Sequence, residues 1–139
     1  MKNRLGKSFV MIMVITAISA LILRIAIKEI IKRNIVQNES YASSTLKLIS
    51  VALENYAKDN RGTYPASLSV LTQTKPAYLD KDYIKLSPLK GYIFDCGRLE
   101  PSGYSCTATP MKCKLNGNIV YNVITGGTLI LDECSKKEK

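Results

Sequence analysis

The chain has 139 residues, of which 46% are apolar, and it carries a formal net charge of +9. A chain of this size can bury one core, so we expect one globular domain with an N-terminal extension. The sequence contains no His, no Gly-rich phosphate loop and no nucleophile beside an identifiable base. These features argue against an enzyme and predict no bound cofactor.

The positive charge is concentrated near the N-terminus, where residues 1–40 hold seven Lys and Arg against two Glu. Basic residues that flank a membrane helix set its orientation, with the positive end on the cytoplasmic side, and contact lipid headgroups. These two roles explain the cluster. Outside this cluster, Arg61, Arg98, Lys112 and Lys114 are the candidates for nucleic-acid binding. They form no basic stripe interleaved with aromatic residues, so we predict no specific nucleic-acid partner.

Residues 9–23 form an apolar run. A basic leader, residues 1–8, precedes the run and contains Lys2, Arg4 and Lys7, and Arg24 follows it. As a helix, this run covers about 22 Å, which is short of the roughly 30 Å core of a bilayer. A signal peptide fits the length and the leader, but residues 24–29 offer no small-residue cleavage site. Residues 8–60 contain neither Gly nor Pro, so one continuous helix of about 80 Å is allowed.

The second half of this expected helix is amphipathic. Apolar and small side chains recur at steps of three and four, namely Ala42, Thr45, Leu46, Ile49, Ala52, Leu53 and Tyr56, while Ser50 and Glu54 fall among the polar positions. The pattern predicts one buried stripe. The alternative is a break near Asn34 or within residues 38–40. We expect three parts: the leader, an apolar helix over residues 9–33, and a globular domain over residues 34–139.

Asp59, Asn60 and Gly62 are expected to end the helix, with Gly62 as a left-handed cap. Pro65 then begins a short turn or helix, and residues 63–90 form a connecting region.

Residues 91–110 read as a hairpin of two alternating strands that reverses near Pro101. In that register Cys96 faces Cys106, Phe94 faces Ala108 and Arg98 faces Tyr104. Alternation places Tyr92, Phe94, Cys96, Cys106 and Ala108 on the face that covers the helix.

A second hairpin, residues 118–132, is expected to reverse in a two-residue type I′ turn at Gly126 and Gly127, which places Cys134 opposite Ile119. The sequence therefore predicts an α+β fold, a long N-terminal helix packed on a small antiparallel sheet.

Four cysteines, Cys96, Cys106, Cys113 and Cys134, lie in the C-terminal third. Their even number and the export-like start favour disulfides in an oxidising compartment. The hairpin registers favour the pairs Cys96–Cys106 and Cys113–Cys134. Zinc is the competing interpretation, but Cys-x-x-Cys pairs and His ligands are both missing.

The leader, the apolar helix from Phe9, its amphipathic continuation and the stretch NYAKDNRGTYPASLSVL together resemble a type IV pilin or a type II secretion pseudopilin. The resemblance is specific in residues 41–71 and looser beyond them. It implies a structural subunit of a bacterial envelope filament that assembles through its apolar helix with copies of itself or other pilin-like subunits. The assembly residues would be Phe9, Met13, Val14, Ile18, Leu21 and Arg24.

Before assembly, such a subunit would lie in the bacterial inner membrane, with its domain in the periplasm or outside. The acidic pairs Asp80 with Asp82 and Asp132 with Glu133 could bind Ca²⁺, as some pseudopilins do in a C-terminal loop. The alternative function is a single-pass, membrane-anchored extracytoplasmic binding module that does not polymerise.

Two positions depart from the family pattern, in which a Gly is followed by the cleaved bond, Phe, three mostly apolar residues and Glu. Aligning Phe9 places Ser8 at the Gly position and Met13 at the Glu position. Cleavage after Gly6 would instead place Met11 fifth. In the family this Glu meets the free N-terminal amine of a neighbouring subunit, and neither register supplies it.

Leader processing is therefore expected to be inefficient, with a substantial fraction of the protein retaining residues 1–6. Intact mass of the protein from native membranes or filaments measures this fraction. A homogeneous species that starts at Lys7 or Phe9 would contradict the prediction.

Overall fold

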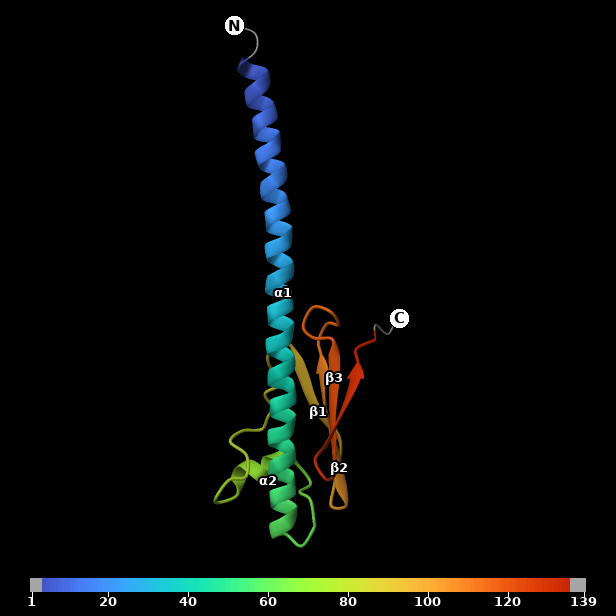
Figure 1. The fold of residues 1–139 in the computed structure, drawn as a ribbon. Coiled ribbons are helices and arrows are strands. Elements are labelled where there is room, and N and C mark those ends of the chain that lie inside the picture. The colour runs from blue at the N-terminus through green and yellow to red at the C-terminus, as the bar shows by residue number, and fades with distance from the viewer. Residues whose placement is uncertain (1–3, 136–139) are drawn as a thin grey trace. The chain divides into compact units, whose positions relative to one another are not determined.

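The computed structural model describes residues 4–135, with side chains described from Ser8 onward. The elements, in chain order, are α1 (Arg4–Asp59), α2 (Leu68–Gln73), β1 (Tyr92–Glu100), β2 (Gly103–Pro110), β3 (Ile119–Ile124) and β4 (Thr128–Glu133) (Figure 1). This is the predicted α+β arrangement. The chain divides into two compact units, the first ending at Arg33 and the second beginning at Asn34. The alternative break near Asn34 is not observed, because α1 continues through it.

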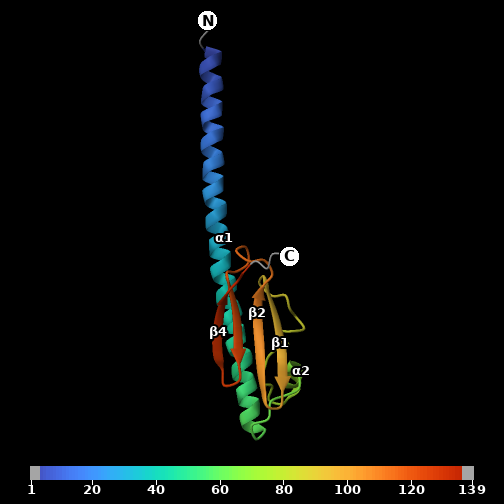
Figure 2. The same cartoon turned by 90° about the vertical axis from the view of Figure 1, so that its right-hand side faces the viewer.

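In the second unit, the buried stripe of α1 packs on one face of the sheet (Figure 2). Ala42, Leu46, Ile49, Ala52 and Leu53 are each at most 2% exposed, as the periodicity predicted. Their partners from the sheet are Tyr92, Phe94, Tyr104, Cys106, Ala108 and Val123. Ser50 was expected on the polar side, but it is buried, with 4% of its surface exposed. Its hydroxyl is hydrogen-bonded to the Tyr104 hydroxyl at 3.0 Å, so this polar group has a partner inside the core.

The end of α1 follows the predicted stop signals with one correction. Arg61, with φ of 56°, takes the left-handed position that was expected for Gly62. The Gly62 amide, one residue later, donates to the Ala57 carbonyl at 2.7 Å, which closes the wide turn of a Schellman-type cap. Gly62 also has a positive φ, 81°. Two successive left-handed residues therefore end the helix, and the second is the residue that tolerates this best.

The strands form one antiparallel sheet in the order β1-β2-β3-β4. In the first hairpin, Cys96 pairs with Cys106 and Phe94 with Ala108, as predicted. The expected pairing of Arg98 with Tyr104 is wrong, because a bulge between Cys96 and Arg98 shifts the register and pairs Arg98 with Ser105. The bulge leaves Arg98 exposed and turns Leu99 toward the core beside Tyr104.

The second hairpin is also shifted by one residue from the expected register. Ile124 pairs with Thr128, so the reversal has three residues instead of two, and Ile119 lies opposite Glu133 instead of Cys134. Gly126 and Gly127 both have positive φ, 87° and 75°. The cause is Thr125, which is held by β2: its amide donates to the Tyr104 carbonyl, and its hydroxyl accepts from the Tyr104 amide at 2.8 Å.

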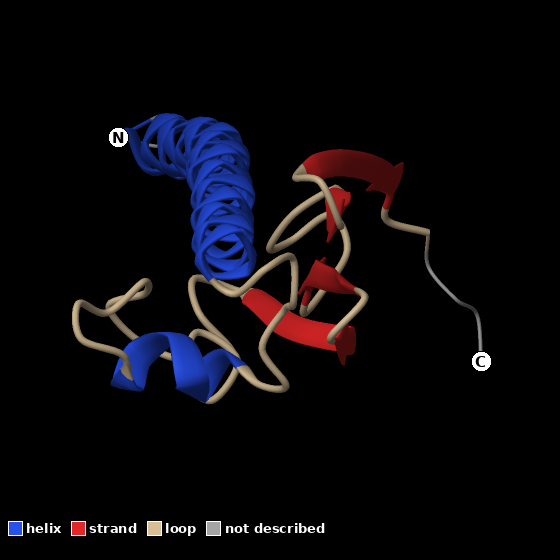
Figure 3. Ribbon diagram, turned by 90° about the horizontal axis from the view of Figure 1, so that it is seen from below, coloured by secondary structure: helices blue, strands red, loops and turns tan. Residues whose placement is uncertain are grey.

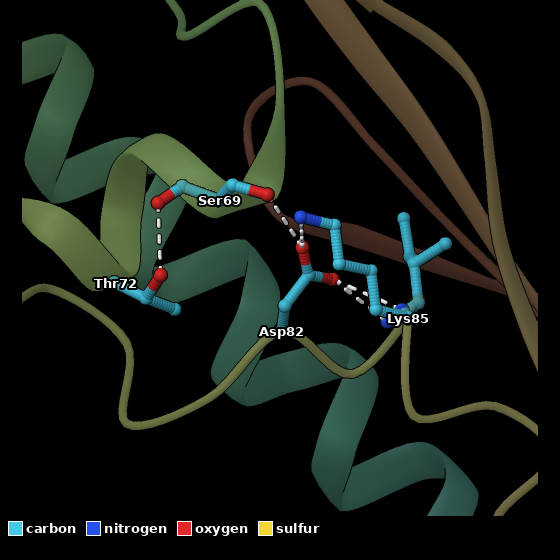
Figure 4. Close-up of polar contacts among 5 residues, drawn as sticks. Ser69, Thr72, Asp82 and Lys85 are labelled. Carbon is cyan, nitrogen blue, oxygen red and sulfur yellow. Dashed lines mark hydrogen bonds and ion pairs between the residues drawn. The ribbon is translucent and has the colours of Figure 1, made fainter.

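The connecting region before the sheet holds one short helix, α2, next to β1 (Figure 3). Leu68 and Leu71 of α2 join the same core. Asp82 fixes the following loop: its carboxylate accepts from the Ser69 hydroxyl at 2.8 Å and from two backbone amides, and it lies 3.9 Å from the Lys85 ammonium (Figure 4). This carboxylate, one of the candidate calcium ligands, therefore already serves the fold.

Removing residues 1–33 should leave a soluble, folded monomer, because the buried stripe of α1, the sheet and both cysteine pairs all lie in the second unit. Size-exclusion chromatography with mass detection, circular dichroism and a free-thiol assay test this. Aggregation of the fragment, or titration of free thiols, would contradict the prediction.

Candidate functional site: the apolar segment of helix α1

The apolar segment of α1, defined as residues 9–23, is exposed along its whole length. The predicted assembly residues in this segment are Phe9 at 65% exposure, Met13 at 57%, Val14 at 51%, Ile18 at 53% and Leu21 at 61%. At about 100° per residue these five side chains lie within one half of the helix circumference. The other half also carries exposed apolar side chains, namely Met11, Ile12, Ile15 and Ile22. An α-helix that is apolar on every side is suited to lipid or to a bundle of other apolar helices.

The two hydroxyl residues inside the segment are satisfied by the helix itself. The Thr16 hydroxyl donates to the Met13 carbonyl and the Ser19 hydroxyl donates to the Thr16 carbonyl, both at 2.9 Å. A polar group without a partner would cost free energy in an apolar environment, and these local bonds avoid that cost. The segment can therefore enter lipid without an unpaired side-chain donor at Thr16 or Ser19.

The helix over Ser8–Asp59 is long and apolar enough to cross a membrane, by length and composition, and none of its most apolar window is buried. By this test alone, a segment of this kind near the N-terminus could be a membrane anchor or a signal sequence. Arg24 ends the apolar run and is exposed.

The leader positions are only partly described. Gly6 lies within the α1 backbone and Ser8 is exposed on the helix, whereas Lys2 lies outside the described residues. From Ser8 the first carboxylate along the helix is Glu29. The position that the family pattern fills with Glu is held by the thioether of Met13, which cannot pair with an amine.

A carboxylate that the sequence did not single out organises the second unit. Glu54 Oε1 accepts from the Tyr104 hydroxyl at 2.9 Å and from the Gly126 amide at 2.8 Å. The Tyr64 hydroxyl donates to Oε2 at 3.0 Å. One side chain on α1 thus binds the segment after the helix, strand β2 and the turn between β3 and β4.

The same contacts change the acidity of the tyrosines. Burial raises the pKa of Tyr104 to about 12, with the hydrogen bond from Ser50 opposing the shift and the bond to Glu54 adding to it. Burial, followed by the hydrogen bond to Glu54, also raises the pKa of Tyr64. Both phenols remain protonated donors across the physiological pH range.

The sequence pattern placed Ser50 and Glu54 on the solvent-facing side of the amphipathic helix, because both side chains are polar. One signal could have located the cluster: Glu54 is the only carboxylate between Glu39 and Asp59. A sheet that buries tyrosines against this helix needs an acceptor for their hydroxyl groups.

Both predicted disulfides are present, Cys96–Cys106 and Cys113–Cys134. The first joins directly opposed residues of β1 and β2. The second ties the residue after β4 to the loop before β3, although the register that suggested it was one residue off. The Cys134 amide donates to the Asn118 carbonyl at 2.7 Å, which places Cys134 beside Asn118 rather than Ile119.

The two candidate calcium pairs are Asp80 with Asp82 and Asp132 with Glu133. No group of three or more Cys, His, Asp or Glu residues that could hold a metal is found within residues 4–135. Asp80 accepts from the Tyr83 hydroxyl at 3.0 Å, and Asp132 and Glu133 are exposed on β4.

Two open depressions of about 480 and 520 Å³ flank the Cys113–Cys134 disulfide. Their lining includes Leu131, which is 55% exposed, and Met111, which is 52% exposed. These depressions carry no catalytic constellation.

No family model, no curated protein and no solved structure matches this chain. The interpretation of the segment therefore depends on its own geometry.

Replacing Glu54 with Ala should lower the free energy of unfolding by about 2–4 kcal/mol, because three donors lose a charged acceptor. Glu54→Gln should cost about half as much, since one carbonyl acceptor remains. Chemical denaturation of the fragment over residues 34–139 measures both. Glu133→Gln removes the same charge from the exposed edge strand and is the matched control. An effect of Glu54→Ala no larger than that of the control would contradict the assigned role.

Proposed function

We propose that this protein is a structural subunit of a bacterial envelope filament, similar to a type IV pilin or a type II secretion pseudopilin. The observation that carries the proposal is a helix that is apolar and exposed on all sides over residues 9–23 and enters a small disulfide-linked α+β domain without a break. The resemblance of residues 55–71 to that family supports it.

The mechanism that we propose is assembly by exchange of apolar contacts. In the inner membrane, lipid covers the segment. In the filament, the segments of neighbouring subunits cover one another, and because lipid tails and apolar side chains are equally apolar, packing contacts decide the association. The domain over residues 34–139 would then lie outside the bilayer, where an oxidising environment keeps both disulfides formed.

The second candidate is an anchored extracytoplasmic binding module that does not polymerise. The missing carboxylate favours it, because Met13 stands where the family places Glu. In the described part of the chain, Glu29 is the first acidic residue. The filament proposal therefore needs contacts other than an ion pair with a neighbouring N-terminus.

Cross-linking within the apolar segment separates the two candidates. Met13 and Ile18 lie about 140° apart around the helix, because five residues turn it by about 500°. The variant Met13→Cys/Ile18→Cys, treated with a thiol-specific two-armed linker that leaves the native disulfides intact, should give ladders of many subunits from cells with the assembly machinery. A second variant, Ile12→Cys/Val14→Cys, places its two thiols about 160° apart and moves one of them to a side that the first variant does not sample.

Each single variant is the control, because one cysteine per subunit can join only two subunits. If every double variant yields only monomers and dimers from abundant, folded membrane protein, the filament proposal fails and the anchored module takes its place.

A further inference from the structure

Beyond the apolar run, α1 carries a set of basic side chains on one side, here called the basic stripe: Arg24, Lys28 and Lys32. They recur every fourth residue, so successive members drift by only about 40° around the helix. Each is exposed. The ion pairs found among the described residues join Lys85 with Asp82 and Arg98 with Glu100, so none of them involves the stripe.

The side of the helix opposite the basic stripe remains apolar over the same residues. Ile27 is 52% exposed and Ile30 is 58% exposed, and both lie on this opposite side with Ala26. The apolar surface therefore has two lengths. On the stripe side it ends before Arg24, after about 22 Å, whereas on the other side it continues to Ile30 and covers about 33 Å from Phe9.

The hydrocarbon core of a bilayer, about 30 Å thick, falls between these two lengths. A membrane-inserted helix then places the apolar side of residues 24–30 in the hydrocarbon core and the basic stripe at the level of the headgroups. Lys and Arg side chains can extend toward this level while their aliphatic stems stay in the apolar region.

We propose that Arg24, Lys28 and Lys32 form a binding site for anionic phospholipid headgroups. The guanidinium of Arg24 can bind two oxygens of one phosphate, and the two ammonium groups supply compact charges along the same side. Glycerophospholipids with a net negative headgroup fit this stripe better than zwitterionic ones.

Charge balance favours lipid over another copy of the helix as the partner. Within residues 8–33 the charged residues are Arg24, Lys28, Lys32 and Arg33 against the single Glu29. A second copy would therefore bring the same excess of positive charge to the stripe, and like charges at close range repel. The inference rests on membrane insertion of α1 and holds whether or not the protein polymerises.

The experiment uses the absence of Trp from the sequence. Ile25, 58% exposed, lies beside the stripe, so Ile25→Trp in the full-length chain gives a single fluorescent reporter. The protein is reconstituted into phosphatidylcholine vesicles that contain an equal mole fraction of either acyl-brominated phosphatidylglycerol or acyl-brominated phosphatidylcholine. Anionic lipid at the stripe should make quenching by the phosphatidylglycerol probe about twofold or more stronger.

In the same reporter background, Arg24→Gln/Lys28→Gln/Lys32→Gln should bring the ratio of the two quenching values to about one. The matched control, Lys47→Gln/Lys58→Gln/Lys112→Gln, removes the same charge from exposed positions of the second unit and should leave the ratio unchanged. The proposal is overturned by equal quenching in the unsubstituted stripe, by an equal loss in the control, or by no quenching from either probe. These vesicles contain no assembly machinery, so the result is independent of filament formation.

Discussion

The position of the sheet along α1 depends on hydrogen bonds to carboxylates of that helix, chiefly to the carboxylate of Glu54. It accepts hydrogen bonds from the Tyr104 hydroxyl of β2 and from the Gly126 amide in the turn between β3 and β4. A second polar anchor lies fifteen residues earlier, where Glu39 Oε1 accepts from the Asn118 amide at 2.7 Å. Between the two anchors the contact is almost wholly apolar. The hydrophobic stripe supplies the stabilisation and is not directional, so the two carboxylates determine the alignment.

A bulge and two disulfides lie at the irregular points of the sheet. The bulge after Cys96 keeps Arg98 in solvent and brings Leu99 to the core, and the Cys96–Cys106 disulfide closes the hairpin directly before the bulge. At the other edge, the Cys113–Cys134 disulfide ties the end of β4 to the loop that follows β2. Each covalent link thus lies where regular pairing stops and the hydrogen-bonded ladder alone would leave the chain free to slip.

The sequence predicted what depends on local pattern and missed what depends on distant contacts. The absence of Gly and Pro from residues 8–60 was enough to predict that α1 is continuous. The helical period of the apolar side chains was enough to predict its buried stripe. The register of the first hairpin was correct up to Cys96 and failed at Gly97, because a glycine fits a regular strand and a bulge equally well. Gly126 and Gly127 are compatible with turns of two or three residues. The choice between them is made by Tyr104 and Glu54, which lie far away in sequence.

The apolar segment over residues 9–23 poses a different problem. A helix that is apolar on all sides can pack against another such helix, but it does not determine how far the two are shifted along their axes. Dispersion forces between residues 9–23 of two copies would be similar for many relative shifts. In a filament whose subunits carried a carboxylate near position 13, an ion pair with a neighbouring amine would select one shift. Met13 removes that selection here. In the proposed filament the register would therefore be set outside residues 9–23. Leu131 and Met111, which are exposed beside the Cys113–Cys134 disulfide, offer apolar surface for such a contact.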